Sequence, residues 1–250
     1  MRYILRLAYV GTAFSGFQVQ PDKRTVQGTL CEACSAYFGA PCFVTGCSRT
    51  DSGVHALDFH AILEVGDDCG RLPPPERLPF ALRPYLPPDL SVLSAGAAPD
   101  GFHIRHDVKS KEYRYLLHLG VSPDPFLSDR AWFYPGKLPD GYLERMREAA
   151  AHLVGTHDFS AFMAQGSSIT DCMRTVYSLT VSEESEYLTV SVVGNGFLYN
   201  MVRIIVGTLM DVAEKRILPS ELPLILASRE RRRAGRTAPP HGLYLWKVDY

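Results

Sequence analysis

The sequence predicts an α+β protein made of two related halves. Its 250 residues suffice for one large domain or two small ones with a sizeable core. Its content of 46% hydrophobic and 21% charged residues is usual for a soluble globular chain. The order of strand-type and helix-type patterns in the first part of the chain recurs in the remainder. We therefore expect an N-terminal subdomain over residues 1–100 and a C-terminal subdomain over residues 101–250.

The first half has the order strand, helix, strand, strand, helix, strand. Thr25 is a suitable N-cap for the first helix, and Gly39 is a suitable residue to end it. Prolines at 73–75 open the second helix, which we expect to run to about residue 85. Alternating or continuous apolar runs predict the strands at 3–9, 41–46, 56–65 and 91–97.

The second half repeats this order with one extra helix. Asp140 is the expected N-cap of its first helix, and Gly155 the expected stop. A hairpin, a long apolar helix and a short helix after Pro219 follow. The expected ranges are strands at 111–119, 174–181, 187–193 and 243–248, and the long helix at about 198–214.

Each half matches the βαββαβ order of ferredoxin-like units, which RNA-recognition modules also use. Joining the two sheets edge to edge would remove two exposed strand edges. We therefore expect a continuous, mainly antiparallel sheet with flanking helices and a central active-site cleft.

Charge and composition exclude several classes of protein. The net charge of −1 argues against a protein that coats nucleic acid without specificity, but it allows a local basic patch such as the arginines of 229–236. No apolar run is long enough to span a membrane, and the N-terminus lacks the pattern of a signal peptide. Cys31 and Cys34 fall inside a predicted helix, which favours buried thiols over a metal site. We expect a cytoplasmic protein without metal or membrane partner.

The stretch CSRTDSGVHA, residues 47–56, carries more chemistry than a turn between two strands requires. Asp51, Ser52 and Gly53 supply the turn residues. Arg49 and Asp51 are two residues apart, so in an extended segment they point to the same side. They form either a local ion pair or a working site, and this stretch alone does not decide between the two.

Arg203 lies in a predicted helix that is otherwise apolar on nearly every side. Such a helix is buried, and a buried arginine needs a partner. No acidic residue stands three or four positions away, so a carboxylate must come from elsewhere in the fold. Asp51 is a candidate.

Seven segments, in order along nearly the whole chain, resemble the bacterial tRNA pseudouridine synthase family called TruA. They are residues 9–12 (YVGT), 24–28 (RTVQG), 49–56 (RTDSGVHA), 102–103 (FH), 113–115 (YRY), 196–207 and 238–244 (APPHGLY). The resemblance implies an enzyme, an isomerase that converts uridine to pseudouridine at positions 38, 39 and 40 of the tRNA anticodon stem-loop. It also implies a homodimer that uses no cofactor.

The resemblance implies a role for each matching residue. Asp51 attacks the target uridine so that its glycosidic bond breaks, and the base then rejoins the ribose through carbon. Arg49 fills the stack that the flipped base leaves, Tyr113 packs against the base and accepts the proton, and Arg203 pairs with Asp51. Leu243 forms an apolar wall of the pocket. The other implied contacts are His55 with the substrate, and Arg24, His103 and Arg105 with RNA.

These roles meet the physical requirements of the reaction. A stacked base must be extruded before its atoms can react, and a planar arginine can fill the gap. A nearby cation keeps a desolvated aspartate ionised. The chain departs from the family at Phe17, usually Trp, at Ser48, usually Gly, and at Ile104, usually Ala, and these changes concern RNA docking.

Three rival hypotheses follow from the same residues. The Asp-Ser-Gly triplet also resembles aspartic proteases, but an adjacent Arg49 would hold Asp51 ionised, which does not suit a shared-proton pair. His55 and His60 are an odd number of residues apart and face opposite sides of a strand, which argues against a metal site. A non-catalytic RNA-binding module of RRM-like fold, with Tyr113 and Tyr115 exposed on its sheet, is the better alternative.

Overall fold

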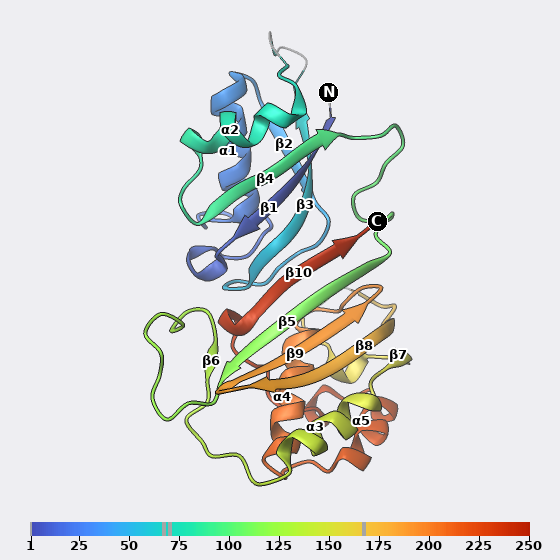
Figure 1. Ribbon diagram of the computed structural model, residues 1–250. Helices are drawn as coiled ribbons and strands as arrows, with labels where there is room; N and C mark the ends of the chain where they lie inside the picture. The colour runs from blue at the N-terminus through green and yellow to red at the C-terminus, as the bar shows by residue number, and fades with distance from the viewer. Residues whose placement is uncertain (1, 67–68, 70–71, 167–168) are drawn as a thin grey trace. The chain divides into compact units, whose positions relative to one another are not determined.

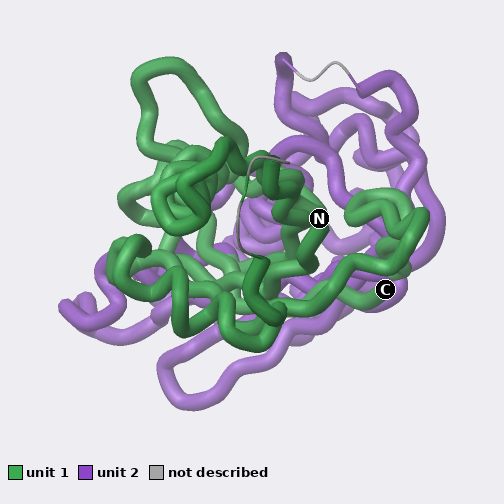
Figure 2. The backbone as a smooth tube through the Cα atoms, turned by 90° about the horizontal axis from the view of Figure 1, so that it is seen from above, with its two compact units in different colours: residues 1–109, 244–250 green, residues 110–243 purple. Residues whose placement is uncertain are grey.

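The computed structural model describes residues 2–66, 69, 72–166 and 169–250, which form two compact units (Figures 1 and 2). Unit 1 comprises residues 1–109 and 244–250, and unit 2 comprises residues 110–243. In the described residues the strands pair mainly antiparallel, and the helices are few. The predicted α+β class with a large, mainly antiparallel sheet is therefore confirmed.

Unit 1 contains a sheet in the order β4-β1-β3-β10, with β2 paired to one part of β3. All its pairs are antiparallel except β10, which runs parallel to β3 with Tyr244 opposite His55. Its elements are β1 (Arg2–Tyr9), α1 (Val26–Phe38), β2 (Cys42–Gly46), β3 (His55–Val65), α2 (Leu78–Leu82), β4 (Leu90–Ala97) and β10 (Leu243–Asp249), whose first residue belongs to unit 2.

Local sequence explains the helix and strands that open unit 1. In β1 every second side chain is buried, beginning at Tyr3, whose ring stacks against Phe38 at the end of α1. The Thr25 hydroxyl oxygen accepts a hydrogen bond from the Gly28 amide (3.2 Å), and Gly39 ends the helix at φ 67°. Both predicted caps are confirmed, because each residue type suits the geometry that its position needs.

Unit 2 contains the strands β5, β9, β8 and β7 in that order, all antiparallel, with β6 parallel to β5. Helices α3, α4 and α5 lie together beside this sheet (Figure 1). The elements are β5 (Ser110–His118), β6 (Trp132–Phe133), α3 (Tyr142–Ala151), β7 (Gly155–Asp158), β8 (Met173–Glu184), β9 (Tyr187–Gly194), α4 (Met201–Ala213) and α5 (Leu222–Ser228).

Two expectations about α3 are wrong. The residue before the helix is Gly141, at φ 73°, and no side chain caps the helix there, so Asp140 is not the N-cap. The helix ends at Ala151, and Gly155 begins β7 instead of stopping the helix. Gly141 takes the left-handed conformation that only glycine adopts readily, and this leaves the preceding aspartate outside the helix.

The C-terminal strand differs from the expected division of the chain. Residues 244–250 return to unit 1, although the sequence pattern put them with the second half, and unit 1 extends to Lys109. The physical reason is the pairing of β10 with β3, a contact far apart in sequence that no local pattern reveals. The expected joining of the two sheets and the expected cleft concern the placement of the units, and they stay predictions.

The described part of the chain contains no helix that is long and apolar enough to cross a membrane. Its cysteines are all free thiols, and Cys31 and Cys34 lie in α1 as expected. Burial raises the pKa of the Cys34 thiol, which keeps it protonated and unreactive.

Asp58, a β3 residue that is 8% exposed, ties together three strands of unit 1. Its carboxylate accepts hydrogen bonds from Arg6 Nε of β1 (2.6 Å) and from the Val248 amide of β10 (3.0 Å), and His60 Nε2 lies 3.1 Å away. Burial alone would raise the pKa of Asp58. The bonds from Arg6 and Val248 and the proximity of His60 outweigh burial and hold that pKa below its usual value.

We expect Asp58→Asn to lower the free energy of unfolding at neutral pH by about 1.5–3 kcal/mol, the range for hydrogen bonds to a charged group. The folded-state pKa is depressed, so the stabilisation is complete above the unfolded value of about 3.9 and is lost as the pH falls through the folded value. Urea denaturation from pH 7 to pH 3 should therefore show a steeper loss of stability in the wild type than in the variant. Parallel pH profiles would contradict this assignment.

Candidate active site

Asp51 lies in the loop 47–54 between β2 and β3. Arg49 is exposed, Thr50 is buried and Asp51 is half-buried, as expected for a short extended segment in which neighbours point to opposite sides. The Thr50 hydroxyl is 2.8 Å from the Tyr9 hydroxyl, and the Thr50 carbonyl accepts a hydrogen bond from the Phe17 amide (3.2 Å). Thr50 thus anchors the loop beside Asp51.

The turn predicted at residues 51–53 is confirmed. Gly53 has φ 81°, and the Val54 amide donates to the Asp51 carbonyl (3.1 Å). The Gly53 amide and the Ser52 hydroxyl both donate to the Phe14 carbonyl, at 3.2 and 3.3 Å. Because the backbone on both sides of Asp51 is hydrogen-bonded, the main chain that carries the carboxylate is held in place.

A second loop, residues 11–17, holds the Asp51 loop through two glycines that sequence reasoning missed. A Cβ on Gly11 would lie 2.0 Å from the Val54 carbonyl oxygen, and a Cβ on Gly16, at φ 84°, would lie 2.6 Å from the Thr50 carbonyl oxygen. Only glycine allows this close approach of two backbones. The available signal was the pair of glycines in the GTAFSG segment.

Phe17, one of the departures from the family pattern, is a core residue of unit 1. Its ring stacks on Phe59 with centroids 4.5 Å apart, and it is almost fully buried. The substitution therefore changes the packing beneath the two loops.

His55, for which we expect a substrate contact, has an internal position in unit 1. It is 1% exposed, its Nδ1 accepts a hydrogen bond from the Gly11 amide (3.0 Å), and its ring stacks on Tyr244 (4.7 Å between centroids). An accepting Nδ1 means that the ring is neutral with its proton on Nε2. This geometry favours a structural role in joining β3, β10 and the 11–17 loop.

Arg24, expected to contact RNA, is paired within unit 1. Its guanidinium donates two hydrogen bonds to the Asp89 carboxylate, each 2.7 Å, and it lies over the Phe14 ring at 4.1 Å. The bidentate pair raises the pKa of Arg24. Arg24 also covers the ring of Phe14, the residue whose backbone carbonyl accepts the hydrogen bonds from Ser52 and Gly53.

His103 and Arg105, also expected to contact RNA, are exposed side chains on the 102–107 connector. The connector is fixed to unit 1, since Arg105 Nε donates to the Gly46 carbonyl (3.0 Å) and the Tyr250 hydroxyl donates to the Ile104 carbonyl (3.0 Å). Ile104, another departure from the family, is buried. Its bulk is thus accommodated inside unit 1.

Tyr113 and Tyr115 lie on β5 in unit 2, and both are buried. The Tyr113 ring, 6% exposed, meets the edge of Phe197 at 5.2 Å. The Tyr115 hydroxyl donates to the Pro239 carbonyl (2.8 Å), and burial raises the pKa of its phenol. The non-catalytic RNA-binding module requires these rings to be exposed, so their burial argues against that alternative.

Arg203 is the half-buried residue of a helix, α4, whose other residues are all buried. Its Nε donates to the Ala238 carbonyl (2.8 Å), and its Nη1 donates to the Asn200 side-chain oxygen (2.7 Å). Leu243, the expected pocket wall, is buried at the start of β10. The expected carboxylate partner from elsewhere in the fold stays a prediction.

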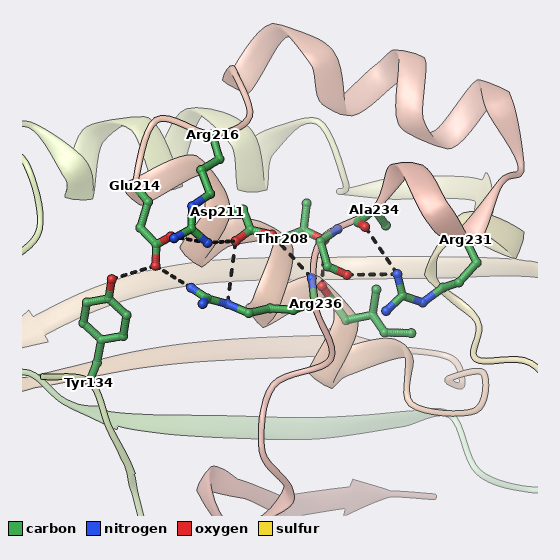
Figure 3. Close-up of polar contacts among 10 residues, drawn as sticks. Tyr134, Thr208, Asp211, Glu214, Arg216, Arg231, Ala234 and Arg236 are labelled. Carbon is green, nitrogen blue, oxygen red and sulfur yellow. Dashed lines mark hydrogen bonds and ion pairs between the residues drawn. The ribbon is translucent and has the colours of Figure 1, made fainter. Parts of the chain in front are cut away.

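Most arginines of 229–236 are paired within unit 2, which partly neutralises the basic patch considered above. Arg229 contacts Asp158 (2.9 Å), and Arg232 contacts Glu230 (2.8 Å). Arg231 donates to the Ala234 and Gly235 carbonyls and to Thr237, and Arg236 contacts Glu214 (Figure 3).

Among the described residues, no three His, Cys, Asp or Glu side chains gather where they could hold a metal.

Comparison with known proteins adds a second, independent observation. A family model described as tRNA pseudouridine synthase matches residues 149–250. The chain is 43% identical to tRNA pseudouridine synthase A of Bacillus subtilis, over all of this chain and 99% of that protein. It is also 43% identical to the protein of the same name from Thermoanaerobacter sp. strain X514, over 97% of this chain and 96% of that protein.

A solved structure of a Cbf5-Nop10-Gar1 complex is 13% identical to the chain, with a TM-score of 0.38. The similarity covers 97% of this chain and 57% of that one, and it is too low to define a shared fold.

We expect Gly11→Ala to destabilise the protein by about 1–3 kcal/mol, the range for overpacking, because the new methyl group overlaps the Val54 carbonyl. Gly96→Ala is the matched control, since a Cβ at Gly96 meets nothing within 4 Å. Urea denaturation measures both changes, and limited proteolysis should cut within residues 47–54 faster in Gly11→Ala than in Gly96→Ala. Equal stability of the two variants would show that the glycine contact does not hold the loop.

Proposed function

The chain belongs to the tRNA pseudouridine synthase A family, TruA, and we propose that it isomerises uridine to pseudouridine in tRNA with Asp51 as the catalytic carboxylate. The observation that carries this proposal is the 43% identity over the full chain and 99% of the relative from Bacillus subtilis. The fixed backbone around Asp51 supports it, because a nucleophile must be held in place before the substrate arrives.

The reaction exchanges one bond to the sugar for another. The bond between N1 of uracil and C1′ of ribose breaks, the base turns, and a bond forms between C5 and C1′. C5 gives up its proton, and N1 ends with one. The carboxylate of Asp51 attacks the target uridine to open the first bond, and it is released again when C5 bonds to C1′. Tyr113, with its phenol deprotonated, accepts the proton from C5.

The target nucleotide must leave its helix before these atoms can be reached, at a cost of a few kcal/mol. We assign Arg49 to the space that the flipped base leaves, because a planar guanidinium can stack where a base stood. The exposure of Arg49 supports this role, since its side chain is available to RNA while Thr50 anchors the backbone beneath it.

A closed pocket desolvates the carboxylate of Asp51 and on its own would raise its pKa and neutralise it. We assign Arg203 to the opposing charge that keeps Asp51 ionised. The hydrogen bonds that fix the Arg203 guanidinium to Ala238 and Asn200 support this role, because a counter-charge acts best when its position is set in advance. We assign Leu243 to the apolar side of the pocket and His55 to the substrate contact that the family resemblance implies. The hydrogen bond from the Gly11 amide to His55 Nδ1 supports a fixed position for that ring.

We further propose that the substrates are uridines at positions 38, 39 and 40 of the anticodon stem-loop, that the enzyme works in the cytoplasm as a homodimer, and that the reaction needs no cofactor. Resemblance to the family supports each of these points. Arg24, His103 and Arg105 remain our candidates for RNA contacts. The fixed connector carrying His103 and Arg105 supports this choice, because exposed polar side chains on a rigid backbone bind with a smaller loss of entropy.

We expect wild-type protein to release tritium to water from tRNA that carries uridine labelled at C5. Asp51→Asn should slow release by about a thousandfold or more at unchanged tRNA binding, a typical loss for a missing nucleophile. Asp22→Asn is the matched control, because it makes the same substitution at an exposed loop position and should release tritium as the wild type does.

Either of two results would contradict the proposal. If Asp51→Asn and the wild type released label equally, Asp51 would not be the catalytic residue. If the wild type bound tRNA tightly without releasing label, the protein would be an RNA-binding module.

A further inference from the structure

Helix α4 carries one polar stripe on an otherwise apolar surface. The stripe comprises Arg203, Gly207, Asp211 and Glu214, whose spacings of about one helical turn place them on the same face. Thr208 lies beside this stripe and is fully buried. A buried helix of this kind needs something polar to cover the stripe.

The cover is residues 234–238, which we call the strap (Figure 3). A Cβ on Gly207 would lie 1.8 Å from the Arg236 carbonyl oxygen. A Cβ on Gly235 would lie 2.6 Å from the Thr208 Cα. The strap therefore lies directly on the helix backbone, with a glycine at each point of closest approach.

Two side chains of the helix bind the backbone of the strap. The Gly235 amide donates to the Thr208 hydroxyl (2.9 Å), which itself donates to the Ile204 carbonyl (2.7 Å). The Arg236 amide donates to Asp211 Oδ2 (3.4 Å). Thr208 and Asp211 are 0% and 9% exposed, so water does not replace these bonds easily.

The side chain of Arg236 continues the attachment towards the end of the helix. Its guanidinium binds Glu214, lies 3.6 Å from Asp211 and stands over the Trp132 ring at 5.3 Å. Glu214 also accepts a hydrogen bond from the Tyr134 hydroxyl (2.6 Å) and contacts Arg216 (2.8 Å). Burial would raise the pKa of Glu214, but these partners hold it below its usual value.

The other end of the strap meets Arg203. The Ala238 amide donates to the Arg203 carbonyl (3.1 Å), and Arg203 Nε donates to the Ala238 carbonyl (2.8 Å). The guanidinium is planar and rigid, so this bond and the bond to Asn200 fix the direction of the whole group. A shift of the strap would move the carbonyl that orients Arg203.

We propose that Thr208 and Asp211 are positioning residues, which hold the strap on α4 so that Ala238 orients the guanidinium of Arg203. This inference rests on the role of Arg203 in the proposed function. Neither residue touches the substrate, and both act through the backbone of the strap. Without their hydrogen bonds to the strap, the guanidinium of Arg203 would be less well aligned for its proposed role beside the catalytic carboxylate.

Thr208→Val tests the proposal with little change of shape, because it replaces the hydroxyl by a methyl group. We expect kcat to fall about five- to tenfold, the rate equivalent of one hydrogen bond, with KM for tRNA unchanged. Thr208→Ser keeps the hydroxyl and should retain wild-type kcat, and Asp211→Ala, which removes the acceptor of the Arg236 amide, should behave like Thr208→Val. Arg232→Ala, an exposed neighbour of the strap, should have no effect.

Coupling to Arg203 separates positioning from a general loss of structure. In an Arg203→Lys background the planar group is absent, so Thr208→Val should cause no further fall in kcat. If the two effects multiply, or if Thr208→Val and Asp211→Ala both keep wild-type kcat, the proposal is overturned. If Asp211→Ala fails to fold, the Thr208→Val and Thr208→Ser pair decides the question alone.

A second readout does not depend on catalysis. In protein labelled with ¹⁵N-arginine, the Nε–H signal of Arg203 should exchange slowly with water in the wild type and in Arg232→Ala, and faster in Thr208→Val. Equal exchange in all three would overturn the positioning role even if the enzyme makes pseudouridine. The two proposals can also fail separately. If the protein makes no pseudouridine but Thr208→Val still accelerates exchange of the Arg203 Nε–H, the proposed function is refuted and the effect of the strap on Arg203 is retained.

Discussion

The structure depends on close contact between backbone segments that have no side chain between them. In unit 1 the 11–17 loop reaches the Asp51 loop at Gly11 and Gly16, and in unit 2 the strap reaches α4 at Gly207 and Gly235. Main-chain hydrogen bonds then fix the Asp51 loop, and the strap is held by one main-chain bond and by the short side chains of Thr208 and Asp211, so few rotatable bonds lie in between. The position of a backbone held in this way varies less than one held by long side chains. A residue that must meet a reacting atom needs such a constrained position.

The two arrangements differ in their chemistry. Around Asp51 the supporting groups are neutral: the hydroxyls of Tyr9 and Thr50, and the neutral imidazole of His55. Around the strap they are charged, with Asp211 and Glu214 facing Arg216 and Arg236. The hydroxyls and the neutral imidazole add no formal charge beside the carboxylate. A charged support suits the strap, because Asp211 and Glu214 offset the positive charge of Arg236.

Sequence reasoning predicted those features that short segments determine. The caps of α1 depend on Thr25 and Gly39 alone, and the burial of Tyr3 follows from the alternation along β1. The predicted start of α3 is wrong because the residue types of Gly141 and Asp140 both occur at helix boundaries. The attachment of β10 to β3 and of the strap to α4 depends on contacts between distant residues, and no periodicity records these contacts. The family resemblance named Asp51, Tyr113 and Arg203, but the residues that support them came only from the structure.

The return of the last strand to unit 1 bears on the order in which the chain folds. Domains generally fold as units during synthesis, with the N-terminal one first. Here β3 acquires β10 as its neighbour only when residues 244–250 have left the ribosome, after every residue of unit 2 has been made. Until then Asp58 lacks the Val248 amide, and His55 lacks the ring of Tyr244. A nascent chain therefore carries the Asp51 loop on an incomplete sheet, and the support for that loop is complete only after residues 244–250 have been made.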